Sequence, residues 1–310
     1  MALEIVLLFP IFISALLFKI YTKFGGSRFN NIRNLLQNLG IYPIRDHYYE
    51  PLFNHRGLKS SLRQKRFLPG IEFNIQDQIK LLKNLNLAHE FVTNLELEQK
   101  NNKLAFYFNN GSFESGDAEF LYQIIRYFKP KNIIEIGSGN STKIALMATD
   151  KNLKEFKYKT NHICIEPYEM SWLEKTKVKV VRNIVENINI DEFSQLKAND
   201  LLFIDCSHII RTQGDVLKIY LEILPFLNKG VIVHIHDIFS PRDYLDSWIL
   251  DEIKLWNEQY ILEALLSNTK RYKIIASLNL LKNDYYDELK NVCPFLDLER
   301  EPGSIYLQII

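Results

Sequence analysis

The chain has 310 residues, long enough to bury a sizeable core in one large domain or two small ones. Its charged fraction of 24% and apolar fraction of 47% are ordinary for a globular protein, so disorder is not expected over most of its length. A formal net charge of +1 gives no reason to expect a nucleic-acid partner. The three cysteines lack C-x-x-C spacing, so the sequence suggests neither a disulfide framework nor a zinc site. Such cysteine usage fits a reducing compartment best.

The chain opens with an apolar run over residues 2–18, broken only by Glu4, Ser14 and Pro10. Its uncharged part would form a helix of about 21 Å, which is shorter than the roughly 30 Å hydrocarbon core of a bilayer. A helix that starts at residue 1 would come closer to spanning that core. No basic residue precedes the run, which disfavours a cleaved signal peptide. We predict a membrane anchor over residues 1–20, with a buried core helix as the alternative.

A basic segment follows directly. Only Asp46 and Glu50 oppose its ten cationic side chains, which are Lys19, Lys23, Arg28, Arg33, Arg45, Arg56, Lys59, Arg63, Lys65 and Arg66. Positive charge after an apolar segment is retained on the cytoplasmic side and attracted to anionic headgroups. The sequence therefore predicts a basic linker over residues 21–70, with membrane contact through residues 1–20 and the segment 19–66. The expected location is the cytoplasmic side of a membrane, or the cytoplasm if the run is a core helix.

Helical patterns come next. Apolar residues at helical spacing predict an amphipathic helix over about residues 74–95. A second helix is predicted over residues 117–128, with Asp117 as its N-cap and Lys129-Pro130 as its end. These helices form the lead-in, residues 71–130, of a domain that is expected to run over residues 71–310.

Beyond residue 130, short apolar runs alternate with helical patterns. This alternation predicts an α/β fold, a doubly wound, mostly parallel sheet over residues 131–310 with a strand pair at its end. The predicted strands are 133–136, 162–166, 178–182, 201–205, 231–237, 272–278 and 304–310, and the helices between them are 141–150, 212–227 and 244–267.

The first of these strands runs into a glycine turn, Gly137-Ser138-Gly139, followed by small hydroxyl residues that can open a helix. Glycines allow a sharp turn and the close approach of a flat ligand, and open α/β sheets bind nucleotides at such corners. A dinucleotide fingerprint would need a third glycine where Thr142 stands, which disfavours a pyrophosphate cradle. A corner without a ligand is the other alternative.

Three further strands end in carboxylates, Glu166, Asp205 and Asp237. Ligands of open α/β sheets gather at the carboxyl ends of the strands. Glu166 presents two acceptor oxygens, which suit both hydroxyls of a ribose. His208 and His236 are candidate general bases, because an imidazole titrates near neutrality.

The order Glu135, Gly137, Gly139 at the end of the first strand resembles motif I of the class I S-adenosylmethionine-dependent methyltransferases. Residues 203–208 and 233–244 resemble the "FIDxSH" and "HxHDIFxPxDY" segments of a bacterial branch of that family, and the likeness spans about residues 109–310. The resemblance implies a seven-stranded Rossmann-like methyltransferase fold with S-adenosylmethionine as cofactor. The implied cofactor-binding residues are Glu135, Gly137, Ser138, Gly139, Glu166 and Asp205.

Related O-methyltransferases hold a divalent ion between acidic residues at the ends of the fourth and fifth strands, which makes Asp205 and Asp237 candidate ligands of Mg²⁺. His236 stands where such enzymes usually carry an acidic residue, and oxygen ligands suit Mg²⁺ best. We therefore favour a histidine base, so that His208, His236 and Asp205 are the predicted catalytic residues.

The expected function is S-adenosylmethionine-dependent methylation of a hydroxyl on a small molecule or a cell-surface glycan intermediate. One alternative is a membrane-tethered binding or scaffold protein that has the methyltransferase fold without turnover. Another is an NAD-dependent oxidoreductase on a similar sheet.

Overall fold

The computed structural model describes residues 2–24, 28–44, 51–92, 97–98 and 104–310. The chain divides into two compact units, Met1–Ser61 and Leu62–Ile310. The second unit holds the sheet.

The N-terminal unit contains the helices α1 (Ala2–Phe24) and α2 (Asn30–Asn38) and the short 3-10 helix η2 (His55–Gly57). The 23 residues of α1 span about 34 Å, more than the roughly 30 Å core of a bilayer. Its segment Leu3–Phe24 is long and apolar enough to cross a membrane, and none of this segment is buried. Arg45, Asp46 and Glu50 of the predicted basic segment lie outside the described residues.

Residues 62–70 belong to the sheet-bearing unit. Arg66 forms an ion pair with Glu263, and Lys65 Nζ lies 2.7 Å from Asp284 Oδ2. The prediction of a linker that reaches residue 70 is therefore wrong for residues 62–70, whose cations are paired with acidic residues of the same unit.

The described residues of the lead-in form three helices, α3 (Ile75–Asn84), α4 (His89–Val92) and α5 (Asp117–Phe128). The single helix predicted over residues 74–95 is wrong, and positions 93–95 lie outside the described residues. Leu85 is 2% exposed and leaves the helical path to enter the core, because its backbone turns extended after α3. The chain then stays non-helical up to α4, and Leu87 N donates there to Gln123 Oε1.

The N-terminus of α5 also differs from the prediction. Gly116, at φ +96°, is the N-cap, and its N–H donates to Glu119 Oε2 at 2.6 Å. Asp117 lies inside the first turn and accepts a hydrogen bond from Gly303 N at 3.1 Å through Oδ2. Asp117 therefore fastens α5 to the segment before the last strand instead of capping the helix.

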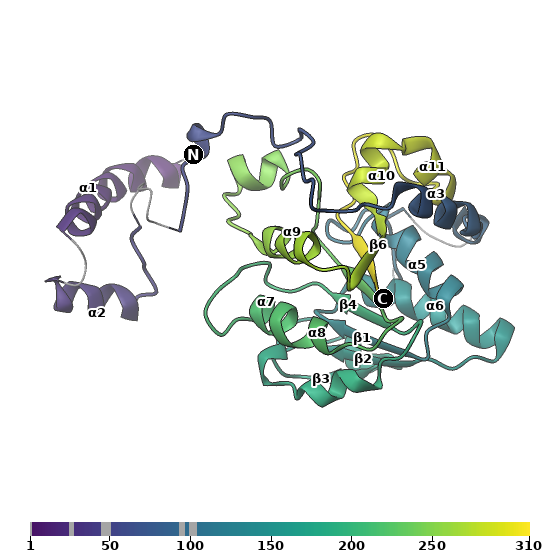
Figure 1. Ribbon diagram of the computed structural model, residues 1–310. Helices are drawn as coiled ribbons and strands as arrows, with labels where there is room; N and C mark the ends of the chain where they lie inside the picture. The colour runs from purple at the N-terminus through teal and green to yellow at the C-terminus, as the bar shows by residue number, and fades with distance from the viewer. Residues whose placement is uncertain (1, 25–27, 45–50, 93–96, 99–103) are drawn as a thin grey trace. The chain divides into compact units, whose positions relative to one another are not determined.

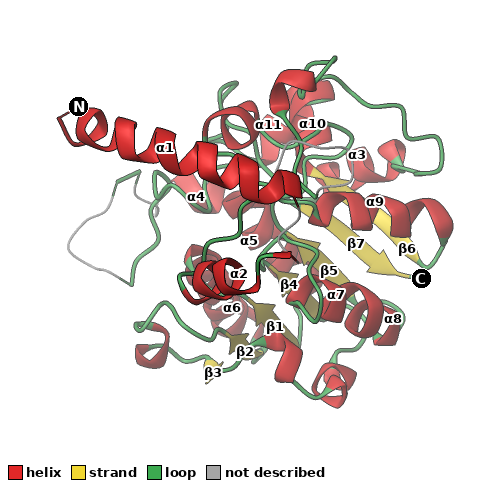
Figure 2. Ribbon diagram, turned by 90° about the vertical axis from the view of Figure 1, so that its left-hand side faces the viewer, coloured by secondary structure: helices red, strands yellow, loops and turns green. Residues whose placement is uncertain are grey.

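Seven strands form one sheet in the order β3-β2-β1-β4-β5-β7-β6, and β7 runs antiparallel to both of its neighbours (Figure 2). The strands are β1 (Asn132–Ile136), β2 (Asn161–Ile165), β3 (Lys179–Val181), β4 (Leu201–Ile204), β5 (Ile232–Ile235), β6 (Tyr272–Ser277) and β7 (Ile305–Ile309). The predicted seven-stranded, mostly parallel α/β sheet is confirmed. The predicted terminal pair exists, but β7 enters between β5 and β6. The strand order reverses between β1 and β4, which places the ends of these two strands at the topological switch point.

Helices cover both faces of the sheet, with α5 and α6 on one side and α7 and α8 on the other (Figure 1). The bounds are α6 (Asn140–Phe156), α7 (Asp215–Lys218), the π-helical turn η6 (Ile219–Ile223), α8 (Leu224–Phe226), the π-helical turn η7 (Ser247–Asp251), α9 (Glu258–Asn268), α10 (Leu278–Asp284) and α11 (Tyr286–Val292). Three short 3-10 helices, η3 (Leu173–Lys175), η4 (Val185–Asn187) and η5 (Ile190–Gln195), lie between β2 and β4. The long helix predicted over residues 244–267 is wrong. It is split into η7 and α9 because the backbone N–H groups of Asn257 and Glu258 donate to the carbonyl of His208.

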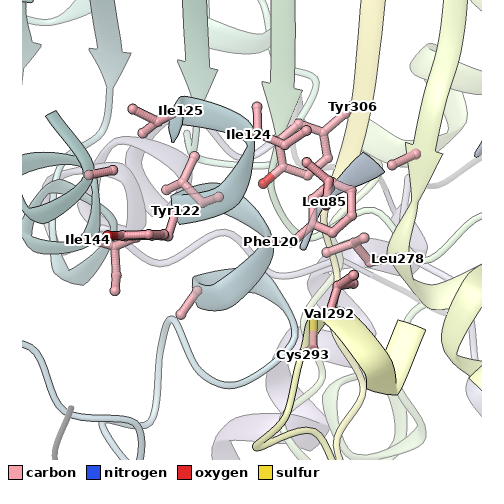
Figure 3. Packing of buried hydrophobic residues seen from close by; sticks show 14 of the residues in the cluster. Leu85, Phe120, Tyr122, Ile124, Ile125, Ile144, Leu278, Val292, Cys293 and Tyr306 are labelled. Atoms are coloured by element: carbon pink, nitrogen blue, oxygen red, sulfur yellow. The ribbon is translucent and has the colours of Figure 1, made fainter. Parts of the chain in front are cut away.

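Alternate residues of the strands pack into two hydrophobic cores, one on each face of the sheet. Ile133 of β1 packs with α5, α6, α10 and α11, and Ile134 packs on the opposite face with η6, α8 and α9. Figure 3 shows the first core, where Phe120, Ile124 and Tyr306 meet residues of α10 and α11. This alternation fixes the register of each strand, and with it the position of the residue that follows the strand at the open edge.

Candidate functional site

The glycine turn lies at the carboxyl end of β1. Gly137 adopts φ +77°, and a Cβ there would lie 1.8 Å from the carbonyl oxygen of Asp205. The backbone of the neighbouring strand end therefore requires this glycine. At Gly139 a Cβ would meet only Met170 Cε, at 3.8 Å. The protein leaves open space at Gly139, which is the space that a ligand approaching the main chain would need.

Glu166 is held next to this turn. Its Oε2 accepts from Ser138 N at 3.3 Å, and its Oε1 accepts from the N–H groups of Tyr168 and Glu169 at 3.0 and 2.9 Å. Two carboxylate oxygens offer about four lone-pair sites, so one remains for a further donor. The backbone amides orient the carboxylate at the end of β2, as a ribose-binding role would need.

Glu135 lies elsewhere. Its carboxylate is fully buried on the α6 side of the sheet, where it accepts from Ser141 Oγ at 3.0 Å and lies 2.8 Å from His162 Nε2 and 3.3 Å from Cys164 Sγ. The Glu135 side chain is thus engaged by groups of the protein, and the cofactor contact expected of this residue stays a prediction. Through Ser141 it ties β1 to the first turn of α6 and so positions the glycine turn.

His208 is the centre of the site. Its Nδ1 lies 2.8 Å from Glu258 Oε2, and its Nε2 lies 3.3 Å from both Asp205 Oδ1 and Asp237 Oδ2. Trp256 covers the ring at a centroid distance of 4.3 Å. Burial would lower the pKa of His208, but hydrogen bonds to Asp205 and Glu258 and the charge of Asp237 raise it well above its ordinary value. Of the strand-end carboxylates predicted from sequence, Asp205 and Asp237 meet at this imidazole, whereas Glu166 lies beside the glycine turn.

His236 is placed differently. Its Nδ1 lies 3.3 Å from Ser304 Oγ, and its Nε2 lies 3.5 Å from Asp237 Oδ1. Burial lowers its pKa, but the charges of Asp237, Asp205 and Asp117 raise it above the ordinary value overall. His234 is fully buried, with its ring centroid 4.2 Å from that of Phe203.

Asp205, His208 and Asp237 could also hold a cation. One ligand atom from each lies within 4.8 Å of the other two. Two carboxylates and an imidazole fit a divalent metal of the manganese-to-zinc type better than an all-oxygen Mg²⁺ site. In this set the histidine is His208, because the imidazole of His236 is directed to Ser304.

A cavity of about 480 Å³ adjoins these residues, and His236 and Asp237 form part of its wall. The loop residues Gly111 and Ser112 line it as well. Asn140, at the start of α6, donates to Ser112 Oγ at 3.0 Å, which links the cavity wall to the glycine turn. Cavity, His208 cluster and glycine turn therefore form one continuous region at the switch point.

The segment that carries these strand ends has recognisable relatives. Residues 134–238 match a family model described as a methyltransferase domain. This segment is similar to methyltransferase domains. The match includes Gly137, Glu166, Asp205, His208 and His236, and it supports a methyltransferase.

Other comparisons cover more of the chain. An uncharacterized protein of Archaeoglobus fulgidus is 28% identical over 164 residues, which are 49% of this chain and 73% of that protein. The plantazolicin methyltransferase BpumL in complex with SAH is 16% identical, with 76% of this chain and 98% of that chain covered and a TM-score of 0.36. CalS11, a TDP-rhamnose 3'-O-methyltransferase, is 12% identical, with coverages of 76% and 95% and a TM-score of 0.38. The fold assignment rests on the strand order of the chain itself.

Two features of the site lie outside the methyltransferase-like segment and were not predicted as site residues. Glu258 holds His208 from 50 residues away, and it is fully buried at the start of α9. Asp117 stands in the wall of the cavity. For Glu258, the available signal in the sequence was its position directly after Trp256-Asn257. No signal distinguished Asp117 from an ordinary capping residue.

Proposed function

We propose that the chain is an S-adenosylmethionine-dependent O-methyltransferase that acts on a hydroxyl of a small molecule or glycan intermediate. The observation that carries this proposal is the contact between two strand ends: the carbonyl of Asp205 packs against Gly137, and the Asp205 side chain lies 3.3 Å from His208. Asp205 thus contacts both the glycine turn, where the cofactor would bind, and the His208 cluster, which would take up the proton. The methyltransferase-domain match over residues 134–238 supports the same activity.

In this proposal the main chain of Gly137, Ser138 and Gly139 receives the cofactor, and Glu166 accepts a hydrogen bond from a ribose hydroxyl through its remaining acceptor site. S-adenosylmethionine, when bound, supplies an electrophilic methyl group. The chain has to align the acceptor oxygen with that group, exclude water and take up the proton of the hydroxyl.

His208 is the better candidate for the proton, because its Nε2 faces the strand ends Asp205 and Asp237, while Nδ1 of His236 is directed to Ser304. The contacts of His208 with Asp205, Glu258 and Asp237 raise its pKa despite burial and so favour the protonated form of the ring, which cannot accept a proton. A divalent cation held by Asp205 and Asp237 would withdraw their charge from His208 and would also favour ionisation of the acceptor. If the cation instead binds His208 Nε2 together with the two aspartates, that nitrogen has no lone pair left for a proton, and the cation alone would then favour ionisation of the acceptor.

Calorimetry with S-adenosylhomocysteine tests the proposal. The full chain should bind it in preference to NAD, and Glu166→Ala should weaken binding by ~1.5–3 kcal/mol through the loss of charged hydrogen bonds. Preferential binding of NAD would instead support the oxidoreductase alternative. Binding without methyl transfer to any hydroxyl acceptor in a mass-spectrometric screen would favour the scaffold alternative.

Substitutions separate the roles inside the cluster. If a cation takes part, EDTA should abolish transfer, and Asp205→Asn and Asp237→Asn should be similarly damaging. His208→Ala should lower turnover by ~10²–10⁴-fold with cofactor affinity intact. A chelator-sensitive enzyme that tolerates His208→Ala would contradict the role given to His208.

For α1 the proposed partner is a lipid bilayer. Its length and its exposed apolar surface, with Phe9 73% exposed, support a membrane anchor that holds the enzyme at the cytoplasmic side.

A further inference from the structure

The 480 Å³ cavity beside His236 and Asp237 has a strongly acidic wall. Carboxylates outnumber arginines among its lining residues, six to two: they are Glu114, Asp117, Asp237, Asp246, Glu299 and Glu301, against Arg63 and Arg300. Walls of one charge sign concentrate ligands of the opposite sign and repel those of the same sign.

Both arginines are engaged by acceptors of the protein. Arg300 forms an ion pair with Glu114, and its Nη2 donates to Asn109 Oδ1 at 2.7 Å. Arg63 donates to the carbonyl oxygens of Asp243 and Tyr244. A phosphate in the cavity would have to compete for these guanidinium groups and would face the remaining carboxylates. The wall is therefore poorly suited to an anionic acceptor.

The surroundings of Asp117 indicate which kind of ligand the cavity binds. The residue is only 6% exposed, and its Oδ2 accepts from Gly303 N at 3.1 Å. Its Oδ1 is buried and has no hydrogen-bond partner among the described residues. A buried carboxylate oxygen without a donor is unfavourable, and an ammonium or hydroxyl of a ligand would remove that deficit.

We propose that this cavity is the acceptor pocket and that it selects a hydroxyl acceptor bearing an amine, as in an amino sugar, over a phosphorylated one, with Asp117 Oδ1 as the acceptor of the ammonium hydrogen bond. The proposal rests on the methyltransferase function proposed above. It narrows the substrate from any small molecule or glycan to the amine-bearing class. Asp117 then acts in specificity, while proton transfer stays with the His208 cluster.

Binding of matched sugars to the full chain, saturated with S-adenosylhomocysteine, tests the proposal. The probes are D-glucosamine and D-glucose 6-phosphate, which share one ring and differ in charge. Titration followed by ligand-observed NMR should give a glucosamine affinity at least ~10-fold higher, as expected for one charge-assisted hydrogen bond. Asp117→Asn should remove most of that preference and leave S-adenosylhomocysteine affinity unchanged.

Two further variants keep the test sharp. Asp246→Asn alters an exposed carboxylate of the same wall without touching the core, and it should reduce the preference in a folded protein. Asp77→Asn on α3, whose carboxylate pairs with Lys273 outside the cavity, is the control and should change nothing. The proposal is overturned if glucose 6-phosphate binds as tightly as glucosamine, if neither sugar binds, or if the preference survives both wall substitutions. If the unaltered chain does not bind S-adenosylhomocysteine, the methyltransferase function itself is refuted.

Discussion

At the residue scale, the two glycines of the turn are required for different reasons. Gly137 is fixed by the protein, since any side chain there would collide with the backbone of Asp205. Gly139 faces open space. A variant at the first glycine therefore tests the fold, and a variant at the second tests the cofactor site.

We expect Gly137→Ala to destabilise the protein by on the order of 3 kcal/mol, because it combines a positive φ with a backbone collision. Gly139→Val should unfold near the temperature of the unaltered chain and yet lose affinity for S-adenosylhomocysteine. Thermal unfolding and calorimetry measure the two effects. Equal stability of the two variants would contradict the different origin of the glycines.

His208 gives a second prediction at this scale. Because Asp205 and Asp237 help to raise its pKa, a cation bound by these carboxylates should move the His208 titration to lower pH. Proton NMR of the histidine ring signals with and without Mg²⁺ or Zn²⁺ measures the shift, and His89 on α4 provides a reference signal. An unchanged His208 titration at saturating metal would show that the two aspartates hold no ion.

At the element scale, the start of α5 depends on a buried carboxylate. Glu119 accepts from the N–H groups of Gly116 and Phe295 and from Ser115 Oγ, yet burial raises its pKa to about 7. The folded state therefore keeps a proton that the unfolded chain releases above about pH 4.5.

Stability should fall as the pH rises from about 4.5 to about 7, by up to about 3 kcal/mol, because the unfolded state binds fewer protons in this window. Urea unfolding at the two ends of the window measures the difference. Glu119→Gln should reduce the pH dependence, although it also lowers stability by placing an amide against donors. Burial also raises the pKa of Asp117, so part of the slope should remain. The exposed Glu192→Gln serves as the control and should keep the dependence. A slope of unchanged size in Glu119→Gln would assign it to other groups.

At the scale of the whole molecule, the boundary between the two units decides where the sheet domain can be separated. The second unit starts at Leu62, and Arg63 and Arg66 belong to its wall and its ion pairs. A chain that starts at Leu68 would lose both arginines and leave Glu263 without this partner. Separation at Leu62 preserves the sheet domain with its cavity.

The truncated chain Leu62–Ile310 should remain in the supernatant after ultracentrifugation with liposomes and keep its affinity for S-adenosylhomocysteine. The full chain should sediment with the liposomes and resist extraction by high salt, because apolar insertion of α1 does not depend on ionic strength. Release by salt alone would assign the attachment to the basic residues of the N-terminal unit. A full chain that stays in solution would refute the anchor.

The local sequence was sufficient to predict the glycine corner of β1, the alternation of strands with helices, and the carboxylates Glu166, Asp205 and Asp237 at strand ends. These features follow from short-range physics: backbone freedom at glycine, hydrophobic periodicity, and the shared edge of parallel strands. Packing between distant segments decided the rest. The insertion of β7 between β5 and β6, the split of the predicted helices around residues 85 and 253, and the contact of Glu258 with His208 each join segments whose proximity no local pattern encodes. Glu135 shows the same limit within one motif, since its strand position was predictable but its burial against His162 depended on the register of β1 with β2.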